Sequence, residues 1–410
     1  MSRRSEAGVV IAGGGLAAQR CAETLRKRGF EAPVRIVCAE DEAPYDRPPL
    51  SKDVAAGTAD GEAVRFRDAD WYADNAVELI LGRRAAGLDP DARELFLDDD
   101  TRLGWDELLI ATGAAPRELP MLSGFANAFP LRTLADAGRL RAALAGGSHL
   151  VIVGAGFIGQ EVAATARRQG VEVTIVEALD VPLAGILGER VGRWIVDLHR
   201  DEGVRVLTGA MLESAAGNGR VEELTLAGGE KLECDAVVVG VGVAPAAAWV
   251  AGSGLDPAGI ATDYAGRTGL PHVYAAGDVS RPFDPRLFDH VRTEHWDAAS
   301  RQGVAAGAAM LGETPRPPAL PSFWSDQYGL RIQYVGHAEG ADEIRVCGEP
   351  GERDFHVLYQ CAGTPVAALT VDRPRELAAM RRLIESSYEG DAVATETYET
   401  PTNAPEEAMP

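Results

Sequence analysis

The chain contains two glycine-rich turns whose spacing suits phosphate binding. The first has Gly13, Gly15 and Ala18 in the pattern Gly-x-Gly-x-x-Gly/Ala. The first glycine permits a tight turn, the second lets a pyrophosphate approach the backbone, and the small third residue lets helix and strand pack closely. Glu40 ends the next expected strand, where a carboxylate can accept hydrogen bonds from a ribose. An ordinary glycine turn would not bring strand, helix and terminal acid into register, so we predict a dinucleotide site.

The second turn repeats the full pattern with Gly154, Gly156 and Gly159, and Glu177 ends its strand. An acid at that position pairs with a free 2′-hydroxyl and repels a 2′-phosphate. No arginine occurs between Glu177 and Gly188 that could neutralise such a phosphate. We therefore expect the second site to prefer NADH over NADPH.

Both turns lie in strand, turn, helix, strand units, which predict parallel sheets covered by helices. The expected elements are a strand at 8–12, a helix at 16–28 and a strand at 34–38, then a strand at 150–153, a helix at 156–168 and a strand at 171–176. Apolar strands that end in glycine turns at 108–113, 235–240 and 273–278 are expected to close the two domains.

A cluster of prolines between 315 and 321 predicts a linker to a third unit, which alternates like an antiparallel sheet and ends in an amphipathic helix. We expect an α/β fold of two Rossmann-like domains plus a C-terminal α+β domain. The expected boundaries are 1–115 with 245–319 for the first dinucleotide domain, 116–244 for the second, 320–390 for the C-terminal domain and 391–410 for a disordered tail.

Composition narrows the class of protein. The 410 residues are 46% hydrophobic, which is enough for two or three domains with apolar cores. The formal net charge of −22 opposes binding to nucleic acid, and no apolar run long enough for a membrane span occurs. The cysteines are scattered, without a metal-ligand cluster, and we expect reduced thiols in a cytoplasmic protein that holds no metal. They are Cys21, Cys38, Cys234, Cys347 and Cys361.

Four motifs resemble those of the flavoprotein ferredoxin reductases of bacterial oxygenase systems, of the putidaredoxin and rhodocoxin type. They are GGGLAA at 13–18, PYDRPPLSK at 44–52, YAAGDV at 274–279 and FWSDQ at 323–327. The resemblance implies a glutathione reductase-like fold, FAD in the first site and NADH in the second. It also implies a small [2Fe–2S] ferredoxin as electron acceptor, which would feed a haem monooxygenase or a ring-hydroxylating dioxygenase, with the reductase a monomer or weak dimer.

The resemblance implies two catalytic residues. Lys52 matches the lysine near the flavin nitrogen that receives hydride, and Glu161 matches the acid that pairs with this lysine and faces the nicotinamide. A cation there stabilises the electron density of reduced flavin. The alternative for Lys52 is a solvated loop charge, against which the rigid Arg-Pro-Pro-Leu-Ser before it argues.

The resemblance also implies a set of cofactor-binding residues, in which Asp278 holds the ribityl and phosphate region of FAD. A helix that begins at 294–296 is expected to point its N-terminal amides at the pyrimidine end of the flavin. Trp296 has packing as an alternative role, and Trp324 or Phe323 could pack the third unit onto the FAD domain. The set is Gly13, Gly15, Leu16, Ala17, Ala18, Glu40, Arg47, Pro48, Lys52, Ala111, Thr112, Gly113, Gly154, Gly156, Phe157, Ile158, Gly159, Glu177, Gly242, Gly277, Asp278, Glu294, His295, Trp296 and Trp324.

Related enzymes that reduce disulfides carry a redox-active cysteine pair after the first glycine turn, and here that region has none. Electrons must therefore leave the flavin for an external acceptor. Two alternatives stay open, an NADH oxidase or diaphorase and a non-catalytic NADH-sensing flavoprotein. A basic cluster is the expected docking rim for an acidic ferredoxin. It consists of Arg281, Arg286, His290 and Arg292.

Overall fold

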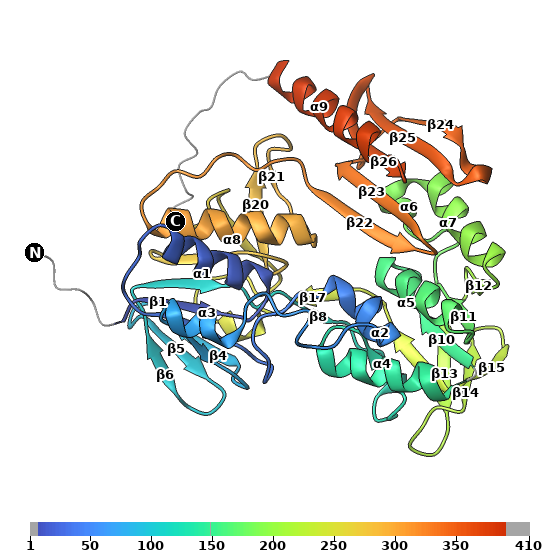
Figure 1. Ribbon diagram of the computed structural model, residues 1–410, viewed down its shortest axis with the longest axis horizontal. Coiled ribbons are helices and arrows are strands. Elements are labelled where there is room, and N and C mark those ends of the chain that lie inside the picture. Colours follow the sequence, from blue (N-terminus) through green and yellow to red (C-terminus); the bar gives the residue numbers. More distant parts are fainter. Residues whose placement is uncertain (1–6, 148, 391–410) are drawn as a thin grey trace, which may run out of the picture.

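The computed structural model describes residues 7–147 and 149–390. The tail expected at 391–410 lies outside the described residues. Figure 1 shows three groups of strands and helices, arranged around a central region that several loops enter. Within the described ranges, no helix is long and apolar enough to cross a membrane.

The first group is a parallel sheet of strand order β19-β7-β1-β2-β3. Helix α1 (Leu16–Lys27) lies against α8 (Trp296–Met310), and the two run side by side in Figure 1. A Cβ on Gly303 of α8 would lie 2.3 Å from the Ala17 carbonyl oxygen, so this close packing requires glycine. The strands are β1 (Val9–Ala12), β2 (Val34–Val37), β3 (Val77–Ile80), β7 (Glu107–Ile110) and β19 (Val273–Ala275).

Smaller elements are distributed over the three groups. One antiparallel sheet is formed by β4 (Ala85–Asp89), β5 (Glu94–Leu97) and β6 (Arg102–Gly104). A second three-stranded sheet is formed by β18 (Ile260–Thr262), β20 (Ser280–Asp284) and β21 (Asp289–His290), where β18 pairs parallel to β20 and β20 pairs antiparallel to β21. The second of these sheets is therefore mixed. The short helices are α2 (Asp53–Ala56) and α3 (Ala69–Asp74), with 3₁₀ turns at Pro48–Ser51, Pro120–Leu122, Ala248–Val250 and Pro350–Glu352.

The second group is a parallel sheet of order β12-β11-β10-β16-β9. Its strands are β9 (Ala128–Pro130), β10 (His149–Val153), β11 (Glu172–Val176), β12 (Arg205–Leu207) and β16 (Ala236–Val239), and its helices are α4 (Leu134–Gly146), α5 (Phe157–Arg168), α6 (Ala184–Leu187) and α7 (Glu189–Asp201). An antiparallel sheet of β13 (Leu212–Ala216), β14 (Glu223–Leu226) and β15 (Lys231–Glu233) packs beside it. The chain enters and leaves through a two-stranded link, β8 (Ala114–Pro116) with β17 (Val243–Pro245).

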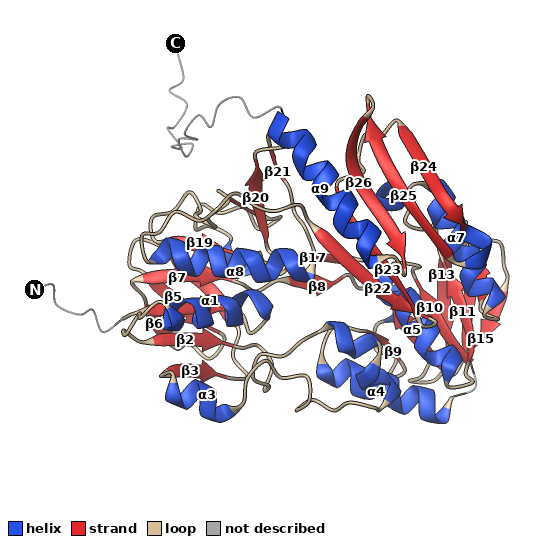
Figure 2. Ribbon diagram, turned by 45° about the horizontal axis from the view of Figure 1, so that its top comes forward, coloured by secondary structure: helices blue, strands red, loops and turns tan. Residues whose placement is uncertain are grey.

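The third group is an antiparallel sheet of order β22-β23-β26-β25-β24, with helix α9 (Pro374–Gly390) against it. Figure 2 shows its strands standing next to α7 of the second group. Side chains of both groups, such as Ile195 and Tyr359, share one hydrophobic core. The strands are β22 (Ser322–Gln327), β23 (Leu330–Gly336), β24 (Glu343–Glu349), β25 (Asp354–Cys361) and β26 (Thr364–Val371).

The expected strands and helices are all present. Most of their observed ends lie within three residues of the expected ends. One start differs: α8 begins at Trp296, and His295 before it has extended backbone, so the helix does not include Glu294 or His295. The reason is that His295 is the N-cap, a position whose backbone is not helical.

Candidate functional site

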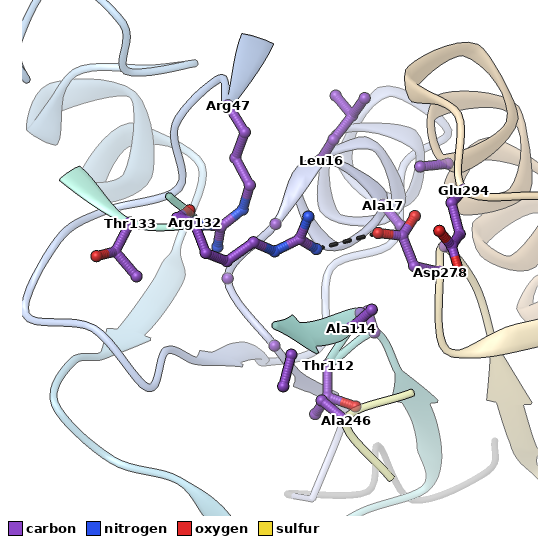
Figure 3. Close-up of a pocket in the computed structure, with 18 of the residues that line it drawn as sticks. Leu16, Ala17, Arg47, Thr112, Ala114, Arg132, Thr133, Ala246, Asp278 and Glu294 are labelled. Atoms are coloured by element: carbon purple, nitrogen blue, oxygen red, sulfur yellow. Dashed lines mark hydrogen bonds and ion pairs between the residues drawn. The ribbon is translucent and has the colours of Figure 1, made fainter. Parts of the chain in front are cut away.

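A cavity of about 890 Å³ lies where the three groups meet. The first glycine turn, the segment 45–52, helix α5, the start of α8 and strand β22 all contribute to its lining. Figure 3 shows side chains from several separate segments, among them Arg47, Arg132 and Asp278, around one space. The cavity therefore depends on packing between parts of the chain that are far apart in sequence.

The glycine turn forms one end of this cavity. Gly13 has a φ of +125°, and a Cβ there would lie 2.1 Å from the Ala111 carbonyl oxygen. Gly15 has open space beside it, and α1 begins at Leu16 without a side-chain cap. The first amides of a helix have no partner within the helix, so this end can receive an anionic group. The Thr112 hydroxyl, buried in the same lining, also has no hydrogen-bond partner.

Charged side chains from four segments meet on one wall. Arg132 Nη2 lies 3.0 Å from Asp278 Oδ2, and Figure 3 shows Arg132 reaching across to that carboxylate. Arg47 pairs with Glu40 at 2.8 Å and donates to the Arg132 carbonyl oxygen. The Tyr45 hydroxyl donates to the second Glu40 oxygen at 2.6 Å. Paired in this way, the two arginines hold fixed positions from which they can bind phosphate or ribose.

Arg132 is a lining residue that the sequence prediction missed. It lies directly before α4, whose first turn has a capping box of Thr133 and Asp136. A capping box predicts where a helix begins but not what the preceding arginine contacts.

The Lys52–Glu161 pair lies deep in the cavity lining. Lys52 Nζ is 2.6 Å from Glu161 Oε2, and the two side chains are 15% and 8% exposed. Ser51 Oγ donates to the same carboxylate oxygen at 2.6 Å, and Ser325 Oγ donates to the other at 2.8 Å. Thr165 of α5 donates to the Ser51 carbonyl oxygen, which joins α5 to the lysine segment. The expected pairing of Lys52 with Glu161 is thus present as a partly buried ion pair.

Aromatic side chains form another part of the cavity lining. The rings of Trp296 and Trp324 are 5.9 Å apart in an edge-to-face arrangement, and Trp296 Nε1 donates to Asp46 Oδ1 at 2.7 Å. His295 packs on Phe323 at 4.8 Å, and its buried Nδ1 has no hydrogen-bond partner. Burial, and then repulsion from nearby His337, lowers the pKa of His295 to about 4, so its ring is neutral at pH 7.

The second glycine turn lies at the start of α5, whose N-cap is Gly156. A Cβ on Gly154 would lie 2.4 Å from the Gly240 carbonyl oxygen, and one on Gly159 would lie 2.4 Å from the Gly154 oxygen. Glu177 accepts hydrogen bonds from the amides of Ala155 at 2.7 Å and Leu179 at 2.8 Å. The carboxylate therefore holds the loop at the end of its strand.

The structure divides the predicted binding residues into two sets. One set lines the cavity of the first glycine turn. It includes Phe157, Ile158 and Glu161 of α5, a helix that starts at the second glycine turn. The described lining does not include Ala18, Gly154, Gly156, Gly159, Glu177 or Gly242. Gly242, with a φ of +93°, lies at the two-stranded link, where its carbonyl oxygen accepts from the Arg117 amide. The remaining predicted residues all line the cavity.

The expected docking rim carries less free charge than its sequence suggests. Arg286 Nε donates to Asp284 at 2.8 Å, and Arg292 pairs with Glu294 at 2.8 Å. His290 Nδ1 lies 3.0 Å from the Arg281 carbonyl oxygen. Acids of the same segment thus pair with Arg286 and Arg292, and the docking role of the four residues stays a prediction.

Comparison with known proteins places this site in a family. The model of pyridine nucleotide-disulphide oxidoreductases matches residues 7–303, and the model of the reductase C-terminal domain matches 322–402. The chain belongs to the pyridine nucleotide-disulphide oxidoreductase family. This membership implies FAD and NAD(H) as cofactors and confirms the expected fold class.

Individual relatives are similar over nearly their whole length. The ferredoxin–NAD(+) reductase component of the anthranilate 1,2-dioxygenase system of Burkholderia cepacia is 39% identical over 92% of this chain and 93% of its own. Putidaredoxin reductase of Pseudomonas putida is 36% identical, with 92% and 91% covered. The crystal structure of the covalent putidaredoxin reductase–putidaredoxin complex has a TM-score of 0.90 at 34% identity and covers 93% of this chain and 94% of that one.

The family name includes disulphide chemistry, for which this chain lacks the cysteines. All five cysteines are free, and the segment 46–52 of the cavity lining contains none. Cys38 lies in the lining next to Gly14, and burial, together with the nearby Glu40 charge, raises its pKa to about 12. A thiol in that state is a poor nucleophile, so a dithiol relay is not available at this site.

Proposed function

We propose that the chain is an FAD-dependent NADH:ferredoxin oxidoreductase, which passes electrons from NADH to a [2Fe–2S] ferredoxin that feeds a monooxygenase or a ring-hydroxylating dioxygenase. One observation carries the proposal. Helix α5, which starts at the second glycine turn, presents Phe157, Ile158 and Glu161 to the cavity of the first. The nicotinamide of one dinucleotide can therefore meet the ring of the other.

The residues present fit both groups. The open space at Gly15, the orphaned Thr112 hydroxyl and the Arg132–Asp278 pair suit the phosphates and ribityl chain of FAD. Glu177 and its glycine loop suit the adenosine ribose of NADH. Bound FAD would accept two electrons at once and release them singly, which matches a hydride donor to a one-electron acceptor.

The chain's own residues prepare the site for this chemistry. The Lys52 ammonium group, whose direction Glu161 fixes, would supply positive charge to the nicotinamide and flavin rings when both cofactors are bound. Phe157, Phe323 and Trp324 contribute apolar surface that excludes water from the reacting rings. All the residues that the sequence predicts as cofactor ligands are proposed here in those roles.

We further propose the domain division 1–115 with 245–319, 116–244 and 320–390, and a cytoplasmic location. The ferredoxin would dock over the Trp296–Trp324 edge. Of the three rim arginines, Arg281 forms no ion pair with an acid in the described part of the chain, whereas Arg286 and Arg292 do. Replacing Arg281 by Gln should weaken ferredoxin binding and its dependence on salt. Unchanged affinity and salt dependence would remove Arg281 from the docking surface.

The proposed function can be tested with the purified chain. Anaerobic stopped-flow mixing with NADH should rapidly bleach the visible absorbance of the flavin. Mixing with NADPH should bleach it much more slowly. Cytochrome c reduction should then depend on added [2Fe–2S] ferredoxin. A flavin that stays oxidised under excess NADH would contradict the proposal, and turnover that is equally fast with oxygen alone would favour an NADH oxidase.

A further inference from the structure

A line of buried polar side chains leads away from Glu161 into the contact between α7 and β22. Ser325 is 0% exposed, and Gln327 and His199 are each 1% exposed. Buried polar groups are unfavourable unless each finds a hydrogen-bond partner. Each of these three side chains has a hydrogen-bond partner, and the partners are up to 167 positions away in sequence.

The direction of each hydrogen bond is fixed. Gln327 Nε2 donates to Gln160 Oε1 at 2.9 Å and to Ser325 Oγ at 3.1 Å. Since the Ser325 oxygen accepts that bond, its own proton is available for Glu161 Oε1, 2.8 Å away. The Gln327 oxygen faces His199 Nε2 at 3.1 Å, so that histidine nitrogen is the donor.

The far end of the line is anchored as well. Burial lowers the pKa of His199 to about 4, so the ring is neutral and can donate from one nitrogen and accept at the other. His199 Nδ1 lies 2.7 Å from the Tyr328 hydroxyl, which is the donor in that pair. The line therefore runs from Tyr328 through His199, Gln327 and Ser325 to the carboxylate.

The three donors to Glu161 are unequally placed. Ser51 and Lys52 both bind Oε2, whereas Ser325 binds Oε1. Two donors on one oxygen leave a carboxylate free to turn about its last bond, and a third donor on the other oxygen prevents this. We propose that Ser325 is a positioning residue that fixes the plane of the Glu161 carboxylate, so that the C-terminal domain completes the Lys52–Glu161 site; this rests on the proposed function.

Removing the hydroxyl tests this role in the flavin-loaded chain. Ser325→Ala leaves Gln327 Nε2 bonded to Gln160, so no buried donor loses its last partner. The limiting rate of flavin bleaching by NADH should fall about tenfold, as expected for loss of an outer hydrogen bond to a functional group, while flavin content and the apparent Kd for NADH stay unchanged. In a Glu161→Gln background the same change should alter the rate less than twofold.

A second measurement needs no NADH. The hydroxyl dipole partly offsets the Glu161 charge, so its loss should lower the midpoint potential of the bound flavin in a dye-equilibrium titration. Ser322→Ala is the matched control, because Ser322 lies on the same strand and donates to Asp297 instead. Ser325→Cys keeps the volume with a weak donor and tests the same bond if Ser325→Ala loses its flavin.

The outcomes separate the two proposals. A wild-type chain whose flavin NADH does not reduce would overturn the proposed function. A wild-type chain that is reduced, together with Ser325 variants that match Ser322→Ala in both rate and potential, would overturn only the positioning role. A slow Ser325→Ala variant whose effect persists in full in the Glu161→Gln background would also overturn it, since the effect would not act through Glu161.

Discussion

Lys52 Nζ lies 2.6 Å from Glu161 Oε2, although 109 positions separate the two residues. Glu161→Gln keeps the shape of the side chain but removes the charge that orients the ammonium group. We expect NADH-dependent flavin bleaching to slow by about 10- to 100-fold, the range typical of losing a partner that orients a functional group.

A double-mutant comparison checks that the two residues act together. Lys52→Met should slow the same step, and adding it to Glu161→Gln should cost little more, because groups that act as a unit are not additive. Glu189→Gln is the control, since Glu189 forms an exposed ion pair with Arg193 at 2.7 Å. If the slowing of flavin bleaching in the double variant equals the product of the two single effects, the pair is not one functional unit.

Glu177 should set the choice between NADH and NADPH. Its carboxylate accepts from Ala155 and Leu179 at the point where the adenosine ribose would bind. Glu177→Ala with Ala178→Arg should shift the ratio of kcat/KM for NADPH over NADH upward by about tenfold or more, since a repulsive charge is replaced by an attractive one. NADH efficiency should fall too, because the glycine loop loses its anchor.

The matched control for this change is Glu172→Ala. Glu172 is an exposed acid at the other end of the same strand, β11. Glu172→Ala should leave the ratio of kcat/KM for NADPH over NADH unaltered. An unchanged ratio in the Glu177 variant would refute the assigned discrimination.

Trp324 should matter more for ferredoxin than for NADH. It lies on the aromatic edge of the cavity with Trp296, and tryptophans at such edges often dominate binding. Trp324→Ala should lower ferredoxin-dependent cytochrome c reduction about tenfold. NADH-dependent bleaching should fall less than that, because Phe157 and Phe323 still line the cavity. Trp71→Phe, on the surface helix α3, serves as the control. Equal loss in both half-reactions would instead assign Trp324 to the flavin site or to packing.

The parts of the fold that could be predicted are those set by residues close together in sequence. The glycine turns, the strands around them and the acids Glu40 and Glu177 all follow from spacing within about 30 residues. Ser325 and Arg132 could not be placed, because their partners Glu161 and Asp278 come from other domains and meet them only when the domains pack.

Acid should destabilise the chain through its buried neutral histidines. Burial lowers the folded-state pKa of His199 to about 4, whereas the unfolded chain binds its proton near pH 6.5. The unfolded state therefore binds more protons between these values, and the stabilisation present above pH 6.5 is lost progressively as pH falls towards 4. For His199 this amounts to at most about 3 kcal/mol.

The measurement is the urea midpoint of the flavin-loaded chain at pH 7 and pH 5. The midpoint should be lower at pH 5, and His199→Gln should reduce the difference, because glutamine does not titrate. His295, with the same lowered pKa from burial and His337, would supply the remaining slope. A His199→Gln variant with an undiminished difference would show that protonation of His199 is not what weakens the fold in acid.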